Sequence, residues 1–329
     1  IIEGQEFVNE ISLTERPFFF EQKGNYVFVG IRQAGKSYLL YQRIQQLLRE
    51  EHNINEIVYI NFDDERLRQM TADDLDLILQ AYHSLFDLRP LLFFDEIQNI
   101  EGWEHFARRL ANQKYNIYIT GSNAKMLSRE IATTLGGRFW NKDIYPYSFA
   151  EYLNARNIIL SKNWMYGKQA AEVSKAFNDY FLYGGFPELT DVIAKRVWLN
   201  DIYSKIFFSD LIVRNKVRNE EALGLLVRRL AENVKQPVSY TRLANLISSI
   251  GIKISKATVI EFIRYLKESC LIFPIENYAA KFAERNSNMK HYFIDNGLLS
   301  IFLLDGNTSL LENIVAIHLY KRYGAQLHF

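Results

Sequence analysis

A glycine-rich motif near the N-terminus constrains the fold of this chain more than any other feature. It fits the pattern G-x-x-x-x-G-K-S and consists of Gly30, Ile31, Arg32, Gln33, Ala34, Gly35, Lys36 and Ser37. An apolar run precedes it at residues 26–29, and a segment with helical periodicity follows at residues 36–50. A strand that turns through glycines into a helix presents backbone N–H groups to phosphate oxygens. The motif therefore predicts a phosphate-binding loop in an α/β fold.

Each polar group of this loop has a role that follows from its chemistry. Lys36 is expected to reach the β- and γ-phosphates of a nucleotide, and the Ser37 hydroxyl to bind Mg²⁺. The predicted cofactors are therefore ATP or ADP with Mg²⁺, held by residues 30–37 and the adjacent Tyr38. A glycine-rich turn without a function is the alternative, and the strand and helix flanks argue against it.

An apolar run that ends in two carboxylates completes the predicted site. Residues 91–94 are Leu-Leu-Phe-Phe, and Asp95 and Glu96 follow them directly. We expect Asp95 to hold Mg²⁺ and Glu96 to polarise the water that attacks the γ-phosphate, as in a Walker B motif. Two acids at a strand end are otherwise ordinary solvated residues, but their pairing with a phosphate loop favours the catalytic interpretation.

The first half of the chain alternates short apolar runs with amphipathic segments, which predicts a parallel sheet covered by helices. The expected strands are residues 26–29, 57–61, 91–95, 117–120 and 139–145. The expected helices are residues 36–50, 72–85, 103–111 and 123–133. Each is long enough for a crossover between parallel strands. We expect one α/β domain, an ATPase core, over residues 1–150.

Two more residues have candidate catalytic roles, and an ordinary structural role is open for each. Asn123 follows the strand at 117–120, where it can orient the attacking water at the ligand-binding sheet edge or cap a helix N-terminus. Arg138 follows Gly136 and Gly137. An arginine on such a loop can act on a neighbouring subunit's nucleotide as an arginine finger, or lie at the surface or in an ion pair.

The second half of the chain is dominated by apolar residues at helical spacing. The expected helices are residues 149–155, 170–182, 195–213, 220–233, 239–250, 255–269 and 310–323. Two short strands are expected at residues 270–277 and 289–295. Two helices followed by a β-ribbon are typical of a winged helix. We expect a helical lid or linker over residues 151–235 and a winged-helix domain over residues 236–300.

Composition excludes several classes of protein. The chain is 48% hydrophobic and 14% aromatic, unlike the polar sequences that remain unfolded. Its apolar runs are only a few residues long, whereas a membrane span needs roughly 20, and no basic-then-apolar leader opens the chain. The single cysteine, Cys270, cannot form an internal disulfide, which is typical of a reducing compartment. We therefore expect a cytoplasmic protein without a membrane partner.

The ordered series of motifs resembles one group of AAA+ ATPases, bacterial and archaeal, in which a P-loop core precedes a winged helix and a nuclease-like C-terminal domain. The resemblance covers nearly the whole chain. Its motifs are GIRQAGKS at 30–37, FDEIQ at 94–98 with GW at 102–103, ITGSN at 119–123, LGGR at 135–138, YPYSF at 145–149, YGGFPE at 183–188 and YFIDNGL at 292–298. The resemblance implies the AAA+ strand order 5-1-4-3-2.

The resemblance also implies that residues 301–329 begin a nuclease-like domain. Glu312 lies at the position of an acidic residue in the first helix of that domain. The chain ends at Phe329, before the other metal ligands and the lysine of such a site, so no nuclease activity is expected of it. A solvent-facing helix position is the simpler interpretation of Glu312.

The predicted winged helix gives only a weak indication of DNA binding. Its second helix carries Lys256, Arg264 and Lys267 opposite its apolar stripe, where they can contact phosphates. Glu261 and Glu268 share that surface and would repel DNA, which favours a packing or interaction module. A further basic cluster suits subunit contacts equally well and consists of Arg214, Lys216, Arg218, Arg228 and Arg229.

These features predict a Mg²⁺-dependent AAA+ ATPase whose ATP cycle drives rearrangement of domains or subunits. Nucleotide is the expected partner, with a homo-oligomer and DNA as possible ones. A nucleotide-binding signalling or scaffold switch with slow turnover is the main alternative. A DNA-processing factor gated by ATP is a third.

Overall fold

The computed structural model describes residues 1–278, 289–304 and 306–329. The chain divides into two compact units. The first unit comprises Ile1–Gly30 and Gly35–Ile144, and the second comprises Ile31–Ala34 and Tyr145–Phe329. Four residues inside the phosphate-loop motif therefore group with the second unit. The subdivision of residues 145–329 into lid, winged helix and nuclease-like segment stays a prediction.

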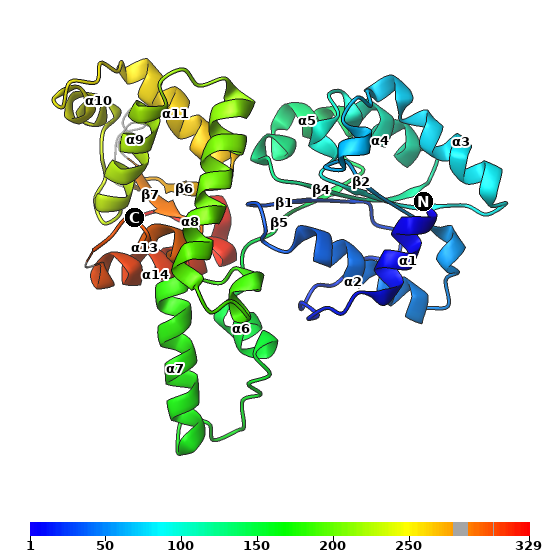
Figure 1. Ribbon diagram of the computed structural model, residues 1–329, viewed down its shortest axis with the longest axis horizontal. Helices are drawn as coiled ribbons and strands as arrows, with labels where there is room; N and C mark the ends of the chain where they lie inside the picture. The colour runs from blue at the N-terminus through cyan, green and yellow to red at the C-terminus, as the bar shows by residue number, and fades with distance from the viewer. Residues whose placement is uncertain (279–288, 305) are drawn as a thin grey trace. The chain divides into compact units, whose positions relative to one another are not determined.

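The first unit is built on a sheet of five parallel strands (Figure 1). The order β2-β3-β4-β1-β5 is the AAA+ order that the resemblance implied. β1 and β3 are buried along their whole length, as expected for strands covered on both faces. The strands are β1 (Tyr26–Val29), β2 (Ile57–Asn61), β3 (Leu91–Asp95), β4 (Asn116–Gly121) and β5 (Trp140–Asp143). The predicted α/β fold class is confirmed.

Helices cover both faces of this sheet (Figure 1). α1 (Ile2–Glu10) and α2 (Lys36–Arg49) lie on one face, and the opposite face carries α3 (Asp76–Leu85), α4 (Trp103–Asn112) and α5 (Arg129–Thr134). The short 3-10 helices of this unit are η1 (Ile54–Glu56), η2 (Glu65–Leu67), η3 (Ala72–Asp74), η4 (Ile97–Asn99) and η5 (Ala124–Leu127).

Polar side chains break two of the helices that the sequence predicts as continuous. The expected helix at 123–133 is instead η5 followed by α5, because the Ser128 side chain accepts a hydrogen bond from the Ile131 N–H and starts a new helix. The expected helix at 72–85 begins as η3, since the Asp74 carboxylate accepts from the Thr71 N–H. Capping of this kind competes locally with helix continuation.

Stacked aromatic rings fill the centre of the first unit. Tyr118 on β4 stacks on Phe93 of β3 at a centroid distance of 4.7 Å and on Tyr26 of β1 at 5.8 Å. These side chains share one face of the sheet because neighbouring parallel strands bring residues in register to the same side. Their burial fixes β1, β3 and β4 side by side, and the carboxyl ends of these strands carry the motif residues.

The described residues of the second unit form helices and one antiparallel ribbon. Its helices are α6 (Phe149–Ala155), α7 (Lys168–Tyr183), η6 (Pro187–Thr190), α8 (Lys195–Lys205), η7 (Ile206–Val213), α9 (Glu220–Glu232), α10 (Tyr240–Ser248), α11 (Lys256–Glu268), α13 (Asn296–Ser300), α14 (Asn307–Tyr323) and η8 (Gly324–Gln326). The helix expected over 195–213 changes type within its span, since η7 is a π-helix.

The predicted winged-helix region contains the expected helices and part of the expected ribbon. α10 packs against α11, and β6 (Ile272–Ile275) pairs with β7 (Lys290–Phe293). Residues 279–288, which fall in the predicted domain, lie outside the described residues. Glu312 on α14 is not a free surface residue, because its carboxylate accepts from Lys290 Nζ at 2.9 Å and from the Tyr292 hydroxyl at 2.8 Å.

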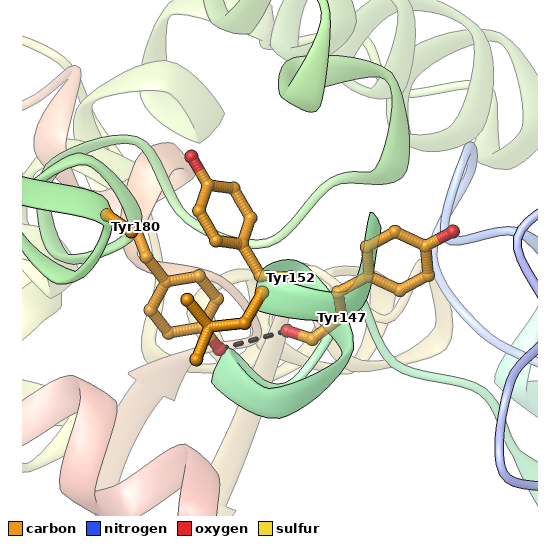
Figure 2. Packing of buried hydrophobic residues seen from close by; sticks show 5 residues of the cluster. Tyr147, Tyr152 and Tyr180 are labelled. Carbon is orange, nitrogen blue, oxygen red and sulfur yellow. Dashed lines mark hydrogen bonds between the residues drawn. The ribbon is translucent and has the colours of Figure 1, made fainter. Parts of the chain in front are cut away.

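Tyrosines join α6 and α7 in the second unit. Figure 2 shows Tyr147, Tyr152 and Tyr180 in one cluster, where the Tyr180 hydroxyl donates to the Tyr147 carbonyl at 2.9 Å. The Tyr152 hydroxyl donates to Asp179 at 2.6 Å. Each of these two rings thus keeps a partner for its polar end. The cluster holds the YPYSF segment against α7.

Two motifs of the resemblance pack on each other in the second unit. The buried Asp295 carboxylate accepts from the Gly185 N–H at 2.8 Å and from the Gly297 N–H at 2.7 Å. A Cβ atom on Gly184 would lie 1.9 Å from Asp295 Oδ1, so no side chain fits there. The YGGFPE and YFIDNGL motifs therefore form a structural joint.

Candidate nucleotide site

The phosphate-loop motif occupies the strand-to-helix turn between β1 and α2. Gly30 has no room for a side chain, because a Cβ atom would lie 1.9 Å from the Ile144 carbonyl oxygen. Gln33 and Gly35 have left-handed backbone conformations, with φ of 61° and 91°. Left-handed residues next to right-handed ones form a concave nest of N–H groups that suits an anion. α2 starts at Lys36, so its N-terminus opens at the same turn.

The loop lysine meets the two carboxylates that the sequence predicted beside it. Lys36 is 3% exposed, and its Nζ lies 3.4 Å from Glu96 Oε1. Asp95 ends β3 and is buried. Its carboxylate accepts from the hydroxyls of Ser37, Thr120 and Tyr59, the last at 2.9 Å. The structure thus brings Lys36, Ser37, Asp95 and Glu96 together at one sheet edge.

The environment of Asp95 favours occupation by a cation. Burial and the adjacent Glu96 carboxylate raise the pKa of Asp95, while the surrounding hydroxyls oppose that rise. A nearby positive ion relieves the same penalty, since it stabilises the charged form. The described residues contain no group of three or more His, Cys, Asp and Glu side chains that could hold a metal ion. A site with one carboxylate and one hydroxyl fits Mg²⁺, which keeps water and phosphate oxygens as its other ligands.

Glu96 is held by both backbone and side-chain contacts. Its φ of 52° is left-handed, and its N–H donates to the Thr120 hydroxyl at 3.0 Å. Gln98 Nε2 donates to Glu96 Oε2 at 2.5 Å and lies 3.3 Å from the Ser122 hydroxyl. The Glu96 side chain therefore lies between an ammonium group and an amide. An unfavourable backbone conformation at this residue is typical of functional sites.

The other predicted site residues, Asn123, Arg138 and Tyr38, have contacts away from the acidic pair. Asn123 caps η5, since its side chain accepts from the Lys125 N–H at 2.9 Å. Arg138 is exposed, and its guanidinium donates to the Gly136 carbonyl at 3.0 Å. Tyr38 is half exposed, with its ring 5.5 Å from that of Tyr41.

Three neighbours of the acidic pair were absent from the predicted site, namely Tyr59, Gln98 and Thr120. Tyr59 lies on β2, which is next to β3 in the sheet. Its hydroxyl also contacts that of Tyr41 at 2.9 Å. Strand order from the family resemblance is the signal that could have placed it beside Asp95. Gln98 belongs to the FDEIQ motif, but its contact with Glu96 depends on the conformation of the turn after β3.

The comparisons with known proteins cover both parts of the chain. Residues 22–153 match the profile of an AAA domain, and residues 174–309 match a domain of unknown function. An uncharacterised protein of Haemophilus influenzae is 32% identical over 304 residues, which are 90% of this chain and 74% of the relative. The chain belongs to the AAA+ family. Its five-stranded sheet order agrees with that membership.

A second uncharacterised relative and one solved structure are also similar to this chain. An uncharacterised protein of Methanocaldococcus jannaschii is 34% identical over 300 residues, and the chain spans 66% of its length and 90% of its own. The Thermotoga maritima RuvB Holliday junction branch migration motor is 17% identical, with a TM-score of 0.36 over 80% of this chain and 86% of that one. A TM-score this low supports no conclusion about this chain.

Within the described residues, no helix has the length and apolar character to cross a membrane.

Proposed function

We propose that this AAA+ protein binds ATP with Mg²⁺ at residues 30–38 and hydrolyses it. The observation that carries the proposal is the 3.4 Å approach of Lys36 Nζ to Glu96 Oε1 beside the buried Asp95. A phosphate-binding cation and a candidate general base thus meet where the loop and the helix N-terminus open. Positioning and electrostatic stabilisation are what phosphoryl transfer requires of a protein.

Binding begins with an exchange of partners at Lys36. The loop N–H groups and the Lys36 ammonium bind the phosphate oxygens, so the ammonium leaves the Glu96 carboxylate. Ser37 and Asp95 are the residues that would hold Mg²⁺. When bound, this ion neutralises charge on the phosphates. Tyr59 and Thr120 keep the Asp95 carboxylate oriented throughout.

Glu96 acts in the chemical step. Once Lys36 contacts phosphate, the Glu96 carboxylate is available to accept a proton from the attacking water. Gln98 holds the other carboxylate oxygen at 2.5 Å, and this fixes the direction from which the base approaches. Asn123 is proposed to orient the same water through its side-chain NH2 group, because its side-chain oxygen caps η5.

The test is the steady-state rate of ATP hydrolysis, with Mg²⁺ present, by wild type, Glu96→Gln and Lys36→Ala. If the wild type hydrolyses ATP and both variants lose that activity, the proposed ATPase function is supported. ATP binding without turnover would support the slow nucleotide switch instead. No binding at all would contradict both functions.

A DNA arm of the same experiment addresses the winged helix. The guanidinium of Arg264 lies 3.3 Å from Glu268 and 3.9 Å from Glu261. Carboxylates on this surface of α11 oppose a polyanion. We therefore expect ATP hydrolysis without DNA, and a large stimulation by duplex DNA would favour the DNA-processing alternative.

We also propose that the protein is located in the cytoplasm and assembles as a homo-oligomer.

A further inference from the structure

One loop of the second unit exposes a cluster of apolar side chains. It comprises residues 156–167, between α6 and α7, and lies at the end of α7 that projects away from the other helices of that unit (Figure 1). Ile159 is 82% exposed, Tyr166 81%, Met165 62% and Leu160 44%. Exposed apolar clusters with a polar rim mark surfaces that meet a partner or a membrane.

Hydrogen bonds order the backbone of this loop. Gln169, in the first turn of α7, donates from Nε2 to the Ile159 carbonyl at 2.7 Å. Its Oε1 accepts from the Ser161 N–H at 3.0 Å and from the Ser161 hydroxyl at 2.7 Å. The Tyr166 N–H donates to the Asn163 carbonyl at 3.0 Å. The exposed side chains therefore extend from an ordered backbone, which lowers the entropy cost of binding.

The charges of this loop and its borders are all positive. Residues 152–171 contain Arg156, Lys162 and Lys168 but no acidic residue. Arg156 pairs with Asp179. Lys162 and Lys168 are exposed, and neither forms an ion pair within the described residues. Two uncompensated cations thus flank the apolar side chains, an arrangement that complements an anionic surface.

We propose that this loop binds the surface of a lipid bilayer that carries anionic headgroups. Trp164 and Tyr166 are of the residue types that concentrate at the boundary between headgroups and acyl chains, and lysines beside them are attracted by anionic lipid. The high exposure of Ile159 and Tyr166 indicates a convex surface. A bilayer can deform around such a surface, whereas a partner protein must offer a groove of matching shape.

An interfacial contact of this kind needs no membrane span. The short apolar runs, from which we expected no membrane partner, therefore do not argue against it. The proposal concerns the second unit alone and does not rest on the proposed nucleotide site.

The first experiment measures co-sedimentation of the full chain with two kinds of vesicle, pure phosphatidylcholine and an equal mixture of phosphatidylcholine and phosphatidylglycerol. The wild type should bind the anionic vesicles and bind the neutral ones much more weakly. Lys162→Gln with Lys168→Gln should lower the partition coefficient by about 25-fold, because each lysine near an anionic surface contributes about fivefold. Lys253→Gln with Lys256→Gln is the control: it makes the same charge change at exposed residues of the predicted winged helix and should bind normally.

A second pair of variants tests the apolar side chains. Ile159→Ser with Met165→Ser should lower binding to anionic vesicles by about tenfold or more, because this apolar surface no longer leaves water. Ile193→Ser with Val197→Ser removes two other exposed apolar side chains of the second unit and should bind normally. Circular dichroism checks the fold of each variant.

Several results of these measurements would overturn the proposal. One is equal binding of the wild type to neutral and anionic vesicles. Another is an equal loss in a loop pair and in its control pair. Absence of vesicle binding by the wild type would also overturn it, and would favour an acidic groove of a partner protein as the surface that meets the loop.

Hydrogen exchange on the wild type locates the contact without any substitution. Anionic vesicles should slow amide exchange in residues 159–168. Residues 240–268 of α10 and α11 serve as the internal reference, because α11 carries the lysines of the predicted winged helix, and their exchange should not change. Slowing confined to residues 240–268 would place the lipid contact on the predicted winged helix and would overturn the proposal.

Discussion

At the scale of single residues, the proposed site depends on a lysine that lies beside a carboxylate. Lys36 Nζ lies 3.4 Å from Glu96 Oε1. A buried cation needs such an anionic neighbour, because burial of an unpaired charge is costly. In the proposed mechanism, a nucleotide phosphate replaces Glu96 as the partner of Lys36.

Lys36→Ala is expected to abolish ATP binding, and hydrolysis with it, because the charge that faces the β- and γ-phosphates is lost. Calorimetry measures the affinity, and circular dichroism checks the fold. Lys175→Ala, an exposed position on α7, is the control and should bind ATP normally. Unchanged affinity of folded Lys36→Ala protein would contradict the phosphate-loop assignment.

Glu96→Gln should bind ATP and Mg²⁺ but hydrolyse more slowly by about 10²-fold or more, since an amide is no base. Steady-state turnover and calorimetry on the same preparation separate chemistry from binding. Glu101→Gln makes the same change at an exposed residue and should leave the rate unchanged. Turnover of Glu96→Gln at the wild-type rate would place the base elsewhere.

Tyr59→Phe tests the hydroxyl that orients Asp95. Its 2.9 Å contact with Asp95 is lost in this variant. The affinity for Mg²⁺ in the presence of ATP should therefore fall by about tenfold, the lower end of such effects for groups that hydrogen-bond a metal ligand. Calorimetry across a Mg²⁺ series gives the value. Tyr41→Phe removes the hydroxyl one step further away and should have a smaller effect. Equal Mg²⁺ dependence in all three proteins would exclude a positioning role for Tyr59.

At the scale of elements, the buried strands were easier to predict than the helices. β1, β2 and β3 match their predicted bounds, because buried parallel strands are near-continuous apolar runs. The break at Ser128 and the π-helix at Ile206–Val213 depend on local hydrogen bonds, which periodicity does not record. Likewise, Asp95 and Glu96 were predictable from spacing, whereas Tyr59 required the strand order.

The joint between the YGGFPE and YFIDNGL motifs gives a prediction at this scale. Gly184 has φ of 78°, and a Cβ atom would collide with the Asp295 carboxylate. Gly184→Ala should lower the free energy of unfolding by about 3 kcal/mol, at the upper end of ordinary substitutions. Gly251→Ala is the control: its φ is 93°, but no atom lies within 4 Å of the added Cβ. Denaturant unfolding of both proteins separates collision from backbone strain, and equal losses would contradict the collision.

At the scale of the whole molecule, Arg138 is the residue whose proposed role requires a second subunit. Within the described residues no carboxylate forms an ion pair with Arg138, which is exposed beside two glycines with left-handed backbone conformations. A surface position and an arginine finger are therefore the two interpretations that the predictions below separate. A neighbouring subunit's nucleotide is the anion that an arginine finger would meet.

Arg138→Ala should bind ATP normally but lose most hydrolysis, because an arginine finger contributes about 10³–10⁵ in rate where its effect is known. Arg129→Ala, nearby on α5, is the control and should stay active. Mixing separates a role in trans from one in cis: Arg138→Ala and Lys36→Ala subunits, each inactive alone, should regain partial turnover in a mixed oligomer that joins an intact finger to an intact loop. Co-purification of one variant with a tagged copy of the other verifies the mixing. Verified mixed oligomers without any rescue, or a strictly monomeric wild type with full activity, would show that Arg138 does not act on a neighbour's nucleotide.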